Sequence, residues 1–138
     1  MFVSIVGGCQ TTGGTLKPAS IPAGTAINPA GDSVSEAHAR FLGLWQGSWG
    51  GQLDGKLAVT HVDADGSVDA IYAWGDHPSG RFPAGHNFRK GRIEGDRLTL
   101  EPFGNGARVS YEYRPDDTLI GSYTRDGQTD TGRFRKAS

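Results

Sequence analysis

The sequence is short of cysteine, of long apolar runs and of any excess of one charge. One cysteine in 138 residues excludes an internal disulfide framework and a zinc site built from several cysteines. No apolar run approaches the roughly 20 residues that a membrane-spanning helix needs. The 14 basic and 15 acidic side chains leave a net charge of −1, so the basic footprint of a nucleic-acid-binding protein is missing. We therefore expect no nucleic-acid partner.

Aromatic and charged residues are also scarce in the first quarter of the chain. No aromatic residue occurs between Val3 and Arg40, and Lys17 is the only charged residue before Asp32. A segment of this composition cannot bury enough apolar surface to fold by itself. Twelve of the thirteen aromatic residues follow Arg40. The sequence therefore predicts a boundary after Asp32, with one folded domain over residues 33–138.

The single cysteine, Cys9, is preceded by the run Ile5-Val6-Gly7-Gly8. This pattern resembles the lipobox of bacterial lipoproteins, in which the bond before the cysteine is cleaved and the thiol is acylated. The resemblance implies that residues 1–8 are the remnant of a signal peptide and that residues 9–32 are a lipidated, flexible tether. It also implies a membrane partner, reached through the lipid anchor without a spanning segment. Gln10 in place of Asp implies sorting to the outer membrane of the bacterial cell envelope, facing the periplasm.

An alternative for Cys9 stays open at this point. A secretory signal normally contains a basic segment and 7–15 apolar residues, whereas only residues 1–6 precede the two glycines. Either the true start lies upstream, or Cys9 is an ordinary free thiol in a loose tail.

A short helix is expected where the folded domain begins. Ser33 and Glu36 have the spacing of a capping box. The residues that follow at helical spacing form one stripe, and Gly43 is a natural end for the helix: Val34, Ala37, His38, Phe41 and Leu42. We expect this helix to pack its stripe on the structure that comes next.

From residue 43 onward, the apolar residues repeat with period two. Turn signals recur about every ten residues, and Asp65-Gly66 is interpreted as a two-residue hairpin turn with positive φ at both positions. Eight strands are expected, at 45–49, 56–63, 67–74, 86–93, 97–102, 107–114, 118–124 and 129–136. Strands in sequence order with short turns favour an antiparallel meander, and closure would remove its two edges. A sheet left half-open between the strands of Trp45 and Phe134 would have the same pattern, so closure itself stays open. The sequence therefore predicts an all-β fold, an eight-stranded antiparallel up-and-down barrel preceded by a short N-terminal helix.

The first predicted strand begins with Gly43-Leu44-Trp45. This tripeptide is similar to the G-x-W signature of the calycins, the superfamily of lipocalins, fatty-acid-binding proteins and avidins. The resemblance implies a lipocalin-like barrel in which Trp45 closes one end and stacks beneath a basic residue of the last strand. Arg133 and Arg135 are placed to supply that cation–π contact. The polar residues that contact biotin in avidins are not found after Trp45, so biotin is not the expected ligand.

The four tyrosines fall on the inward-facing register of their strands. With two tryptophans they form the candidate ligand-binding residues inside the barrel: Trp49, Tyr72, Trp74, Tyr111, Tyr113 and Tyr123. They predict a pocket with aromatic walls and polar tips that orients a small amphipathic ligand. The alternative is a filled core whose hydroxyls bond to the backbone at the barrel ends. Gly121 either leaves room for the ligand or lets the sheet bend.

One connection is longer than the others, from Gly75 to His86. Long ordered loops often act as lids. Phe82 is then expected to cover the mouth of the barrel, and Arg81 to meet an anion such as a carboxylate. The alternative is an ordinary loop folded over the mouth.

Catalytic and metal-binding patterns are weak. The four histidines lack the spacing of metal ligands, although Asp76, His77 and His86 could meet at the base of the long loop. We expect no metal, no cofactor and no catalytic residue, and whether the protein is an enzyme stays undecided, with a non-enzyme favoured. Three functions remain: a ligand-binding envelope lipoprotein, a structural or inhibitory lipoprotein with a filled barrel and an unknown protein partner, and an enzyme of calycin-like fold.

Overall fold

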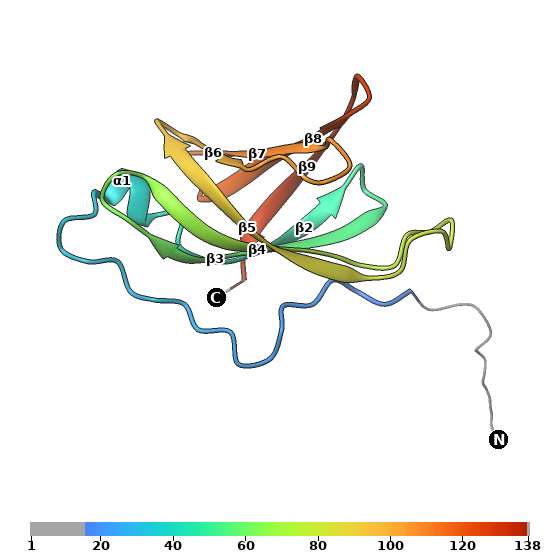
Figure 1. Ribbon diagram of the computed structural model, residues 1–138, viewed down its shortest axis with the longest axis horizontal. Coiled ribbons are helices and arrows are strands. Elements are labelled where there is room, and N and C mark those ends of the chain that lie inside the picture. The colour runs from blue at the N-terminus through green and yellow to red at the C-terminus, as the bar shows by residue number, and fades with distance from the viewer. Residues whose placement is uncertain (1–15, 138) are drawn as a thin grey trace.

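The computed structural model describes residues 16–137. Cys9, on which the lipobox prediction depends, lies outside the described residues. Eight strands form a closed antiparallel barrel in sequence order. They are β2 (Gly43–Trp49), β3 (Leu53–Val62), β4 (Ser67–Trp74), β5 (Gly85–Glu94), β6 (Arg97–Leu100), β7 (Arg108–Tyr113), β8 (Thr118–Arg125) and β9 (Gln128–Lys136). The predicted eight-stranded up-and-down barrel is therefore confirmed (Figure 1).

The predicted helix is much shorter than expected. Only α1 (Glu36–Ala39) is helical, and its N-cap is Ser35, whose hydroxyl accepts a hydrogen bond from the His38 amide at 3.3 Å. None of its residues is buried. A helix of one turn has little stability of its own, so burial of the residues that follow decides the path of the chain. Phe41 is completely buried, and placing it inside the barrel ends the helix two residues earlier.

The first hairpin turn also differs from the prediction. Gly66 has φ +92°, but Asp65 is not in the left-handed region. The Asp63 amide donates to the Ser67 carbonyl at 2.8 Å, and the Gly66 amide donates to the Asp63 carbonyl at 3.0 Å. This is a four-residue connection in which only the last residue needs positive φ, rather than a two-residue turn. The glycine is required at that one position.

The end of the barrel that carries α1 is closed by aromatic packing. Trp45 is buried, and its indole N–H donates to the Phe41 carbonyl at 2.9 Å. Tyr113 packs edge-on against both rings, with centroids 5.8 Å from Phe41 and 6.4 Å from Trp45. The Arg40 guanidinium lies 4.2 Å from the centre of the Tyr113 ring. We call this the closed end.

The cation on Trp45 is Lys136, not Arg133 or Arg135 as predicted. The Lys136 ammonium lies 4.4 Å from the centre of the Trp45 ring and donates to the Leu42 carbonyl at 2.6 Å. Partial burial lowers the pKa of Lys136. The register explains the difference, because β9 pairs Lys136 directly with Trp45, whereas the two arginines project from the outer face. Arg133 pairs there with Asp116 at 3.2 Å.

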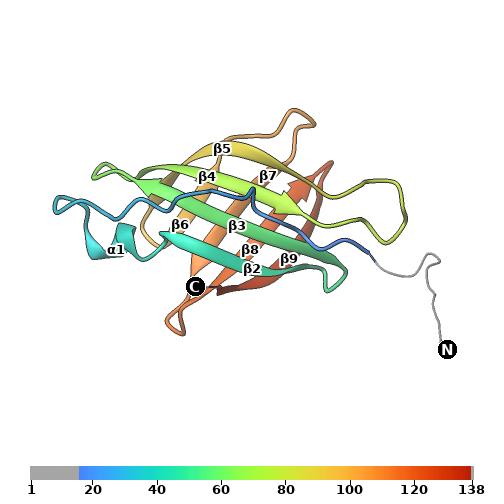
Figure 2. The same ribbon diagram turned by 90° about the horizontal axis from the view of Figure 1, so that it is seen from below.

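Part of the predicted tether lies against the outside of the barrel (Figure 2). Residues 17–28, which we call the strap, hydrogen-bond to the barrel at three places. The Ala19 amide donates to Asp54 at 2.7 Å and the Asn28 amide to the Thr60 carbonyl at 2.9 Å, while Lys17 bonds to Asp76. Ala19 is completely buried. The barrel thus holds this segment of the chain in a fixed place.

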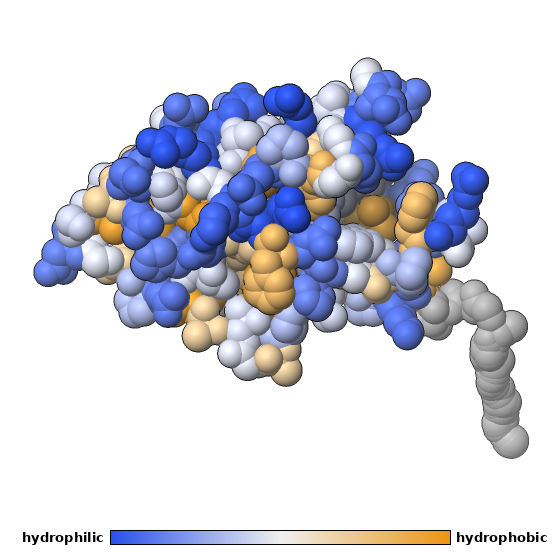
Figure 3. All heavy atoms as spheres, in the orientation of Figure 1, coloured by the Kyte–Doolittle hydropathy of each residue, from blue (hydrophilic) through white to orange (hydrophobic). Residues whose placement is uncertain are grey.

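The outer surface is largely hydrophilic on the side shown in Figure 3, where hydrophobic residues form small separate patches. The large hydrophobic residues that are exposed are Leu16, Phe82 and Phe88. Between residues 16 and 137 there is no helix of the length and hydropathy needed to cross a bilayer.

Candidate functional site

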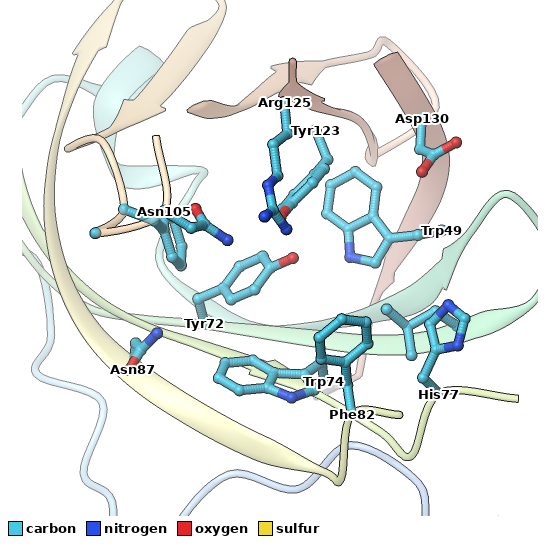
Figure 4. A pocket seen from close by; sticks show the side chains of 13 residues that line it. Trp49, Tyr72, Trp74, His77, Phe82, Asn87, Asn105, Tyr123, Arg125 and Asp130 are labelled. Carbon is cyan, nitrogen blue, oxygen red and sulfur yellow. The ribbon is translucent and has the colours of Figure 1, made fainter. Parts of the chain in front are cut away.

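The end of the barrel opposite α1 holds a cavity of about 480 Å³. Its lining residues come from the hairpin β2–β3, the connections β4–β5 and β6–β7, and the hairpin β8–β9, together with Tyr72 and Asn87 of β4 and β5. Figure 1 shows these connections at the end of the barrel away from α1. Six of its thirteen lining residues are Trp, Tyr or Phe (Figure 4): Trp49, Tyr72, Trp74, Phe82, Phe103 and Tyr123. We call this end the open end. Its cavity falls within the 300–1,000 Å³ that small-molecule sites usually occupy.

Trp49 forms the floor of the cavity. Its ring packs on Gly121, where an added Cβ would lie only 2.7 Å from the indole, and against Gly55 of β3. Phe134 packs edge-on against the same ring at 5.0 Å between centroids, and Tyr111 lies 6.1 Å away. The space that Gly121 leaves is therefore filled by Trp49 and is not open to a ligand. Below this floor the barrel is a packed core.

The Tyr72 hydroxyl points into the cavity, and the indole nitrogen of Trp49 lies on the side of its ring nearer to Tyr72 (Figure 4). The indole N–H of Trp49 is buried and has no hydrogen-bond acceptor among the described residues. It lies close enough to the Tyr72 hydroxyl to influence its pKa, but not in a hydrogen-bonding geometry. Burial, with a smaller effect of Tyr123, raises the pKa of Tyr72 above its usual value, so its hydroxyl keeps its proton at neutral pH. Because the indole nitrogen is enclosed, the Tyr72 hydroxyl is the group of the floor that can donate to an acceptor in the cavity.

Trp74 and Phe103 stand on one side of the cavity as fixed aromatic walls. The Trp74 N–H donates to the Pro83 carbonyl at 2.9 Å, and Gly85 lies against one face of the ring, where an added Cβ would be 2.8 Å away. Phe103 packs edge-on against Tyr72 at 4.9 Å between centroids. These contacts hold the rings in place before any ligand enters, so binding need not order them.

The rim of the cavity is polar. Asn87, Asn105, Arg125 and Asp130 line it, and sequence reasoning missed all four. The sequence did contain a signal for Arg125, because this residue follows Tyr123 by two positions and therefore lies on the same face of the strand. Its guanidinium lies 3.6 Å from the exposed Asp126 carboxylate, a contact that solvent weakens. The rim can therefore offer amide groups and one cation to the polar part of a ligand.

The long loop over residues 75–84 contributes two side chains to the mouth. His77 and Phe82 line the cavity and pack edge-on at 5.7 Å. The base of this loop is fastened by Asp76, whose carboxylate accepts from the Lys17 amide at 2.9 Å and from the Ala84 amide at 2.8 Å. These hydrogen bonds, that from Lys17 first, lower the pKa of Asp76. The strap thus supports the loop that lines the mouth.

The structure brings together most, but not all, of the predicted ligand-binding residues. Five of them line the cavity: Trp49, Tyr72, Trp74, Phe82 and Tyr123. Tyr111 is completely buried beneath Trp49, with its hydroxyl unpaired among the described residues. Tyr113 lies at the closed end, where its hydroxyl donates to Asp117. Arg81 is exposed in the loop and does not line the cavity, so Arg125 is the cation there.

The histidines do not assemble into a metal site. Among residues 16–137 no three side chains of His, Cys, Asp or Glu come together as potential metal ligands. His77 bonds instead to the Ser79 hydroxyl at 2.7 Å, and His86 packs edge-on against Phe88. The cavity therefore offers aromatic surface and hydrogen bonds.

No protein-family model and no curated protein sequence matches the chain.

Proposed function

We propose that this protein is an envelope lipoprotein whose barrel binds a small amphipathic ligand at its open end. One observation carries the binding part, the aromatic cavity of about 480 Å³ into which the protonated Tyr72 hydroxyl points. The Tyr72 hydroxyl can donate a hydrogen bond, so the ligand end that reaches the floor is a hydrogen-bond acceptor, such as a carbonyl, ether or carboxylate oxygen. Its apolar body lies against Trp74 and Phe103, and its outer end meets the polar rim.

The calycin resemblance supports this proposal. Trp45 stands at the closed end beneath a lysine of the last strand, in the position that the G-x-W signature implies. We propose on this ground that the barrel is calycin-like. The cavity occupies the opposite, open end.

A lipoprotein that acts through protein contacts is the second candidate. The packed core below Trp49 favours it, and so does Phe88, which is 67% exposed on the outer face of β5. The two candidate functions predict different roles for Trp74 and Phe88. Trp74 lines the cavity and would contact a ligand, whereas Phe88 lies outside the cavity and would contact a protein partner.

Replacing Trp74 by alanine is expected to weaken binding of an amphipathic probe about tenfold. The probe is 1-anilinonaphthalene-8-sulfonate, which has aromatic rings and sulfonate oxygens that can accept hydrogen bonds, and its fluorescence enhancement is the measurement. The loss of one aromatic wall, about 1.4 kcal/mol, corresponds to that factor. Phe88→Ala is the matched control and should leave the affinity unchanged. Equal affinities for Trp74→Ala and the unsubstituted protein would contradict the cavity as the binding site.

The lipid anchor has its own test. The protein, expressed from its full-length gene with any residues that precede Met1 included, is expected to carry labelled palmitate in a Gram-negative host and to fractionate with the outer membrane. Cys9→Ser removes the acylated thiol and should abolish both. Absence of label in the unsubstituted chain would refute the anchor and leave the ligand cavity untouched.

A further inference from the structure

A second recess lies outside the barrel, beside the strap. It is a groove of about 600 Å³ between the strap and the strands β2, β3 and β9. Its lining contains three cations and two uncharged polar side chains: Lys56, Arg133, Arg135, Gln46 and Ser48. We call this recess the basic groove. Figure 2 shows the strap crossing β3, with β2 and β9 beside it.

The strand register brings the cations of the basic groove together. Gln46 pairs with Lys56 of β3 on one side and with Arg135 of β9 on the other. Their neighbours Trp45, Leu57 and Phe134 are buried, so all three side chains project outward. Neighbouring strands in a sheet are about 4.8 Å apart. Lys56 on β3 and Arg135 on β9 are two strands apart, so their backbones are separated by about 10 Å. The Gln46 amide lies between them as a further hydrogen-bond donor.

The positive charge of the groove is only partly neutralised. Asp54, the one acid in the lining, accepts the hydrogen bond from the strap at Ala19. Asp116 pairs with Arg133 at 3.2 Å. Within residues 16–137, no carboxylate forms an ion pair with Lys56 or Arg135. An anion can therefore sit between these two side chains without displacing an existing partner.

We propose that the basic groove binds the phosphate of an anionic lipid headgroup. Phosphate suits a site of this kind because a guanidinium offers it two parallel hydrogen bonds and an ammonium adds a point charge. The choice of a lipid rests on the lipid anchor proposed above. Pro18 lines the groove and lies nine residues after Cys9, which limits the span between them to about 30 Å. An acylated Cys9 would hold the groove near the bilayer at a high effective concentration.

Vesicle binding tests this proposal without the acyl chain. The protein is the full chain carrying Cys9→Ser, and the probes are vesicles of phosphatidylcholine with and without about 30% phosphatidylglycerol. Binding to the anionic vesicles is expected, and Lys56→Gln with Arg135→Gln should weaken it about 30-fold, or about fivefold for each cation. A matched double variant, Arg92→Gln with Arg108→Gln, removes two exposed cations from other strands and should change binding less than threefold.

Several outcomes would overturn the proposal. Equal losses in the two double variants would show that net charge alone drives binding, and no binding to anionic vesicles would exclude the headgroup. Binding of inorganic phosphate without any binding to anionic vesicles would identify a free phosphate site instead. Failure of the anchor is visible separately, as loss of palmitate label from Cys9, so the two proposals fail in different experiments.

Discussion

Replacing Trp49 by alanine is expected to lower the free energy of unfolding by about 3–5 kcal/mol. Large aromatic-to-alanine substitutions in a core cost this much because they lose buried surface and leave a cavity. Trp49 is 5% exposed and its ring packs against Tyr72, Tyr111, Tyr123 and Phe134. Few other side chains in this barrel join so many aromatic neighbours. Urea unfolding followed by circular dichroism, with the midpoint and slope fitted together, measures the change.

The substitution also removes the floor of the ligand cavity. Space opens above Gly121 and Gly55, against which the indole packs, and the buried Tyr111 hydroxyl gains access to the cavity. A variant that does not fold would leave the effect unmeasured, so Trp49→Phe is the second variant, with a smaller loss of about 1–2 kcal/mol. Trp74→Ala is the control, because that ring is only partly buried at the mouth. If Trp74→Ala costs as much stability as Trp49→Ala, Trp49 is not the central packing residue.

The strands were predictable because two local signals agree along this chain. Inward residues repeat with period two, as Val109, Tyr111 and Tyr113 do in β7, and turn residues follow at short intervals. All eight strands appear in the structure, with ends that shift by up to three residues. The cost of two open edges favoured closure, but a half-open sheet would have the same sequence pattern. The pairing of β2 with β9, which closes the barrel, is a long-range contact that only the structure shows.

The errors arose where distant parts of the chain decide local structure. The strap has the composition of a free linker, yet its Ala19 is completely buried. The Asp54 carboxylate accepts a hydrogen bond from the Ala19 amide, and the Asp76 carboxylate accepts one from the Lys17 amide. The composition of the strap contains no signal for partners 35 to 59 residues away. In the same way, the cation on Trp45 depends on the register between β2 and β9, which a motif at one end of the chain does not specify.

The candidate site was predictable to the extent that strand alternation determines it. Alternation placed Tyr72 and Tyr123 inside the barrel, and both line the cavity. It could not distinguish the depth of a residue along the barrel axis. Tyr111 and Tyr113 share their face, but they lie beneath the floor and at the closed end. Depth depends on the stagger of all eight strands, which is a property of the closed barrel.

Replacing Gly47 by valine is expected to destabilise the barrel by about 3 kcal/mol or more, through the contact between its first and last strands. An added Cβ at Gly47 would lie 2.1 Å from the Arg133 carbonyl oxygen, and one at Gly132 would lie 2.1 Å from the Ser48 carbonyl oxygen. Both obstacles are backbone atoms, which cannot rotate away as a flexible side chain would. Adding atoms to a well-packed structure costs about 1–3 kcal/mol and occasionally more. At Gly47 the added atoms would push apart β2 and β9, whose pairing closes the barrel.

Hydrogen exchange locates this effect. The amides of β2 and β9 should lose protection in Gly47→Val before those of β3 and β4, because the pairing of β2 with β9 opens first. Gly104→Val is the matched control, since an added Cβ there meets no atom within 4 Å and its φ is not in the left-handed region. Its unfolding midpoint should stay close to that of the unsubstituted protein. Unchanged protection of β2 and β9 in Gly47→Val would mean that the two strands can separate slightly without strain, and that close backbone contact at these glycines is not what holds the barrel closed.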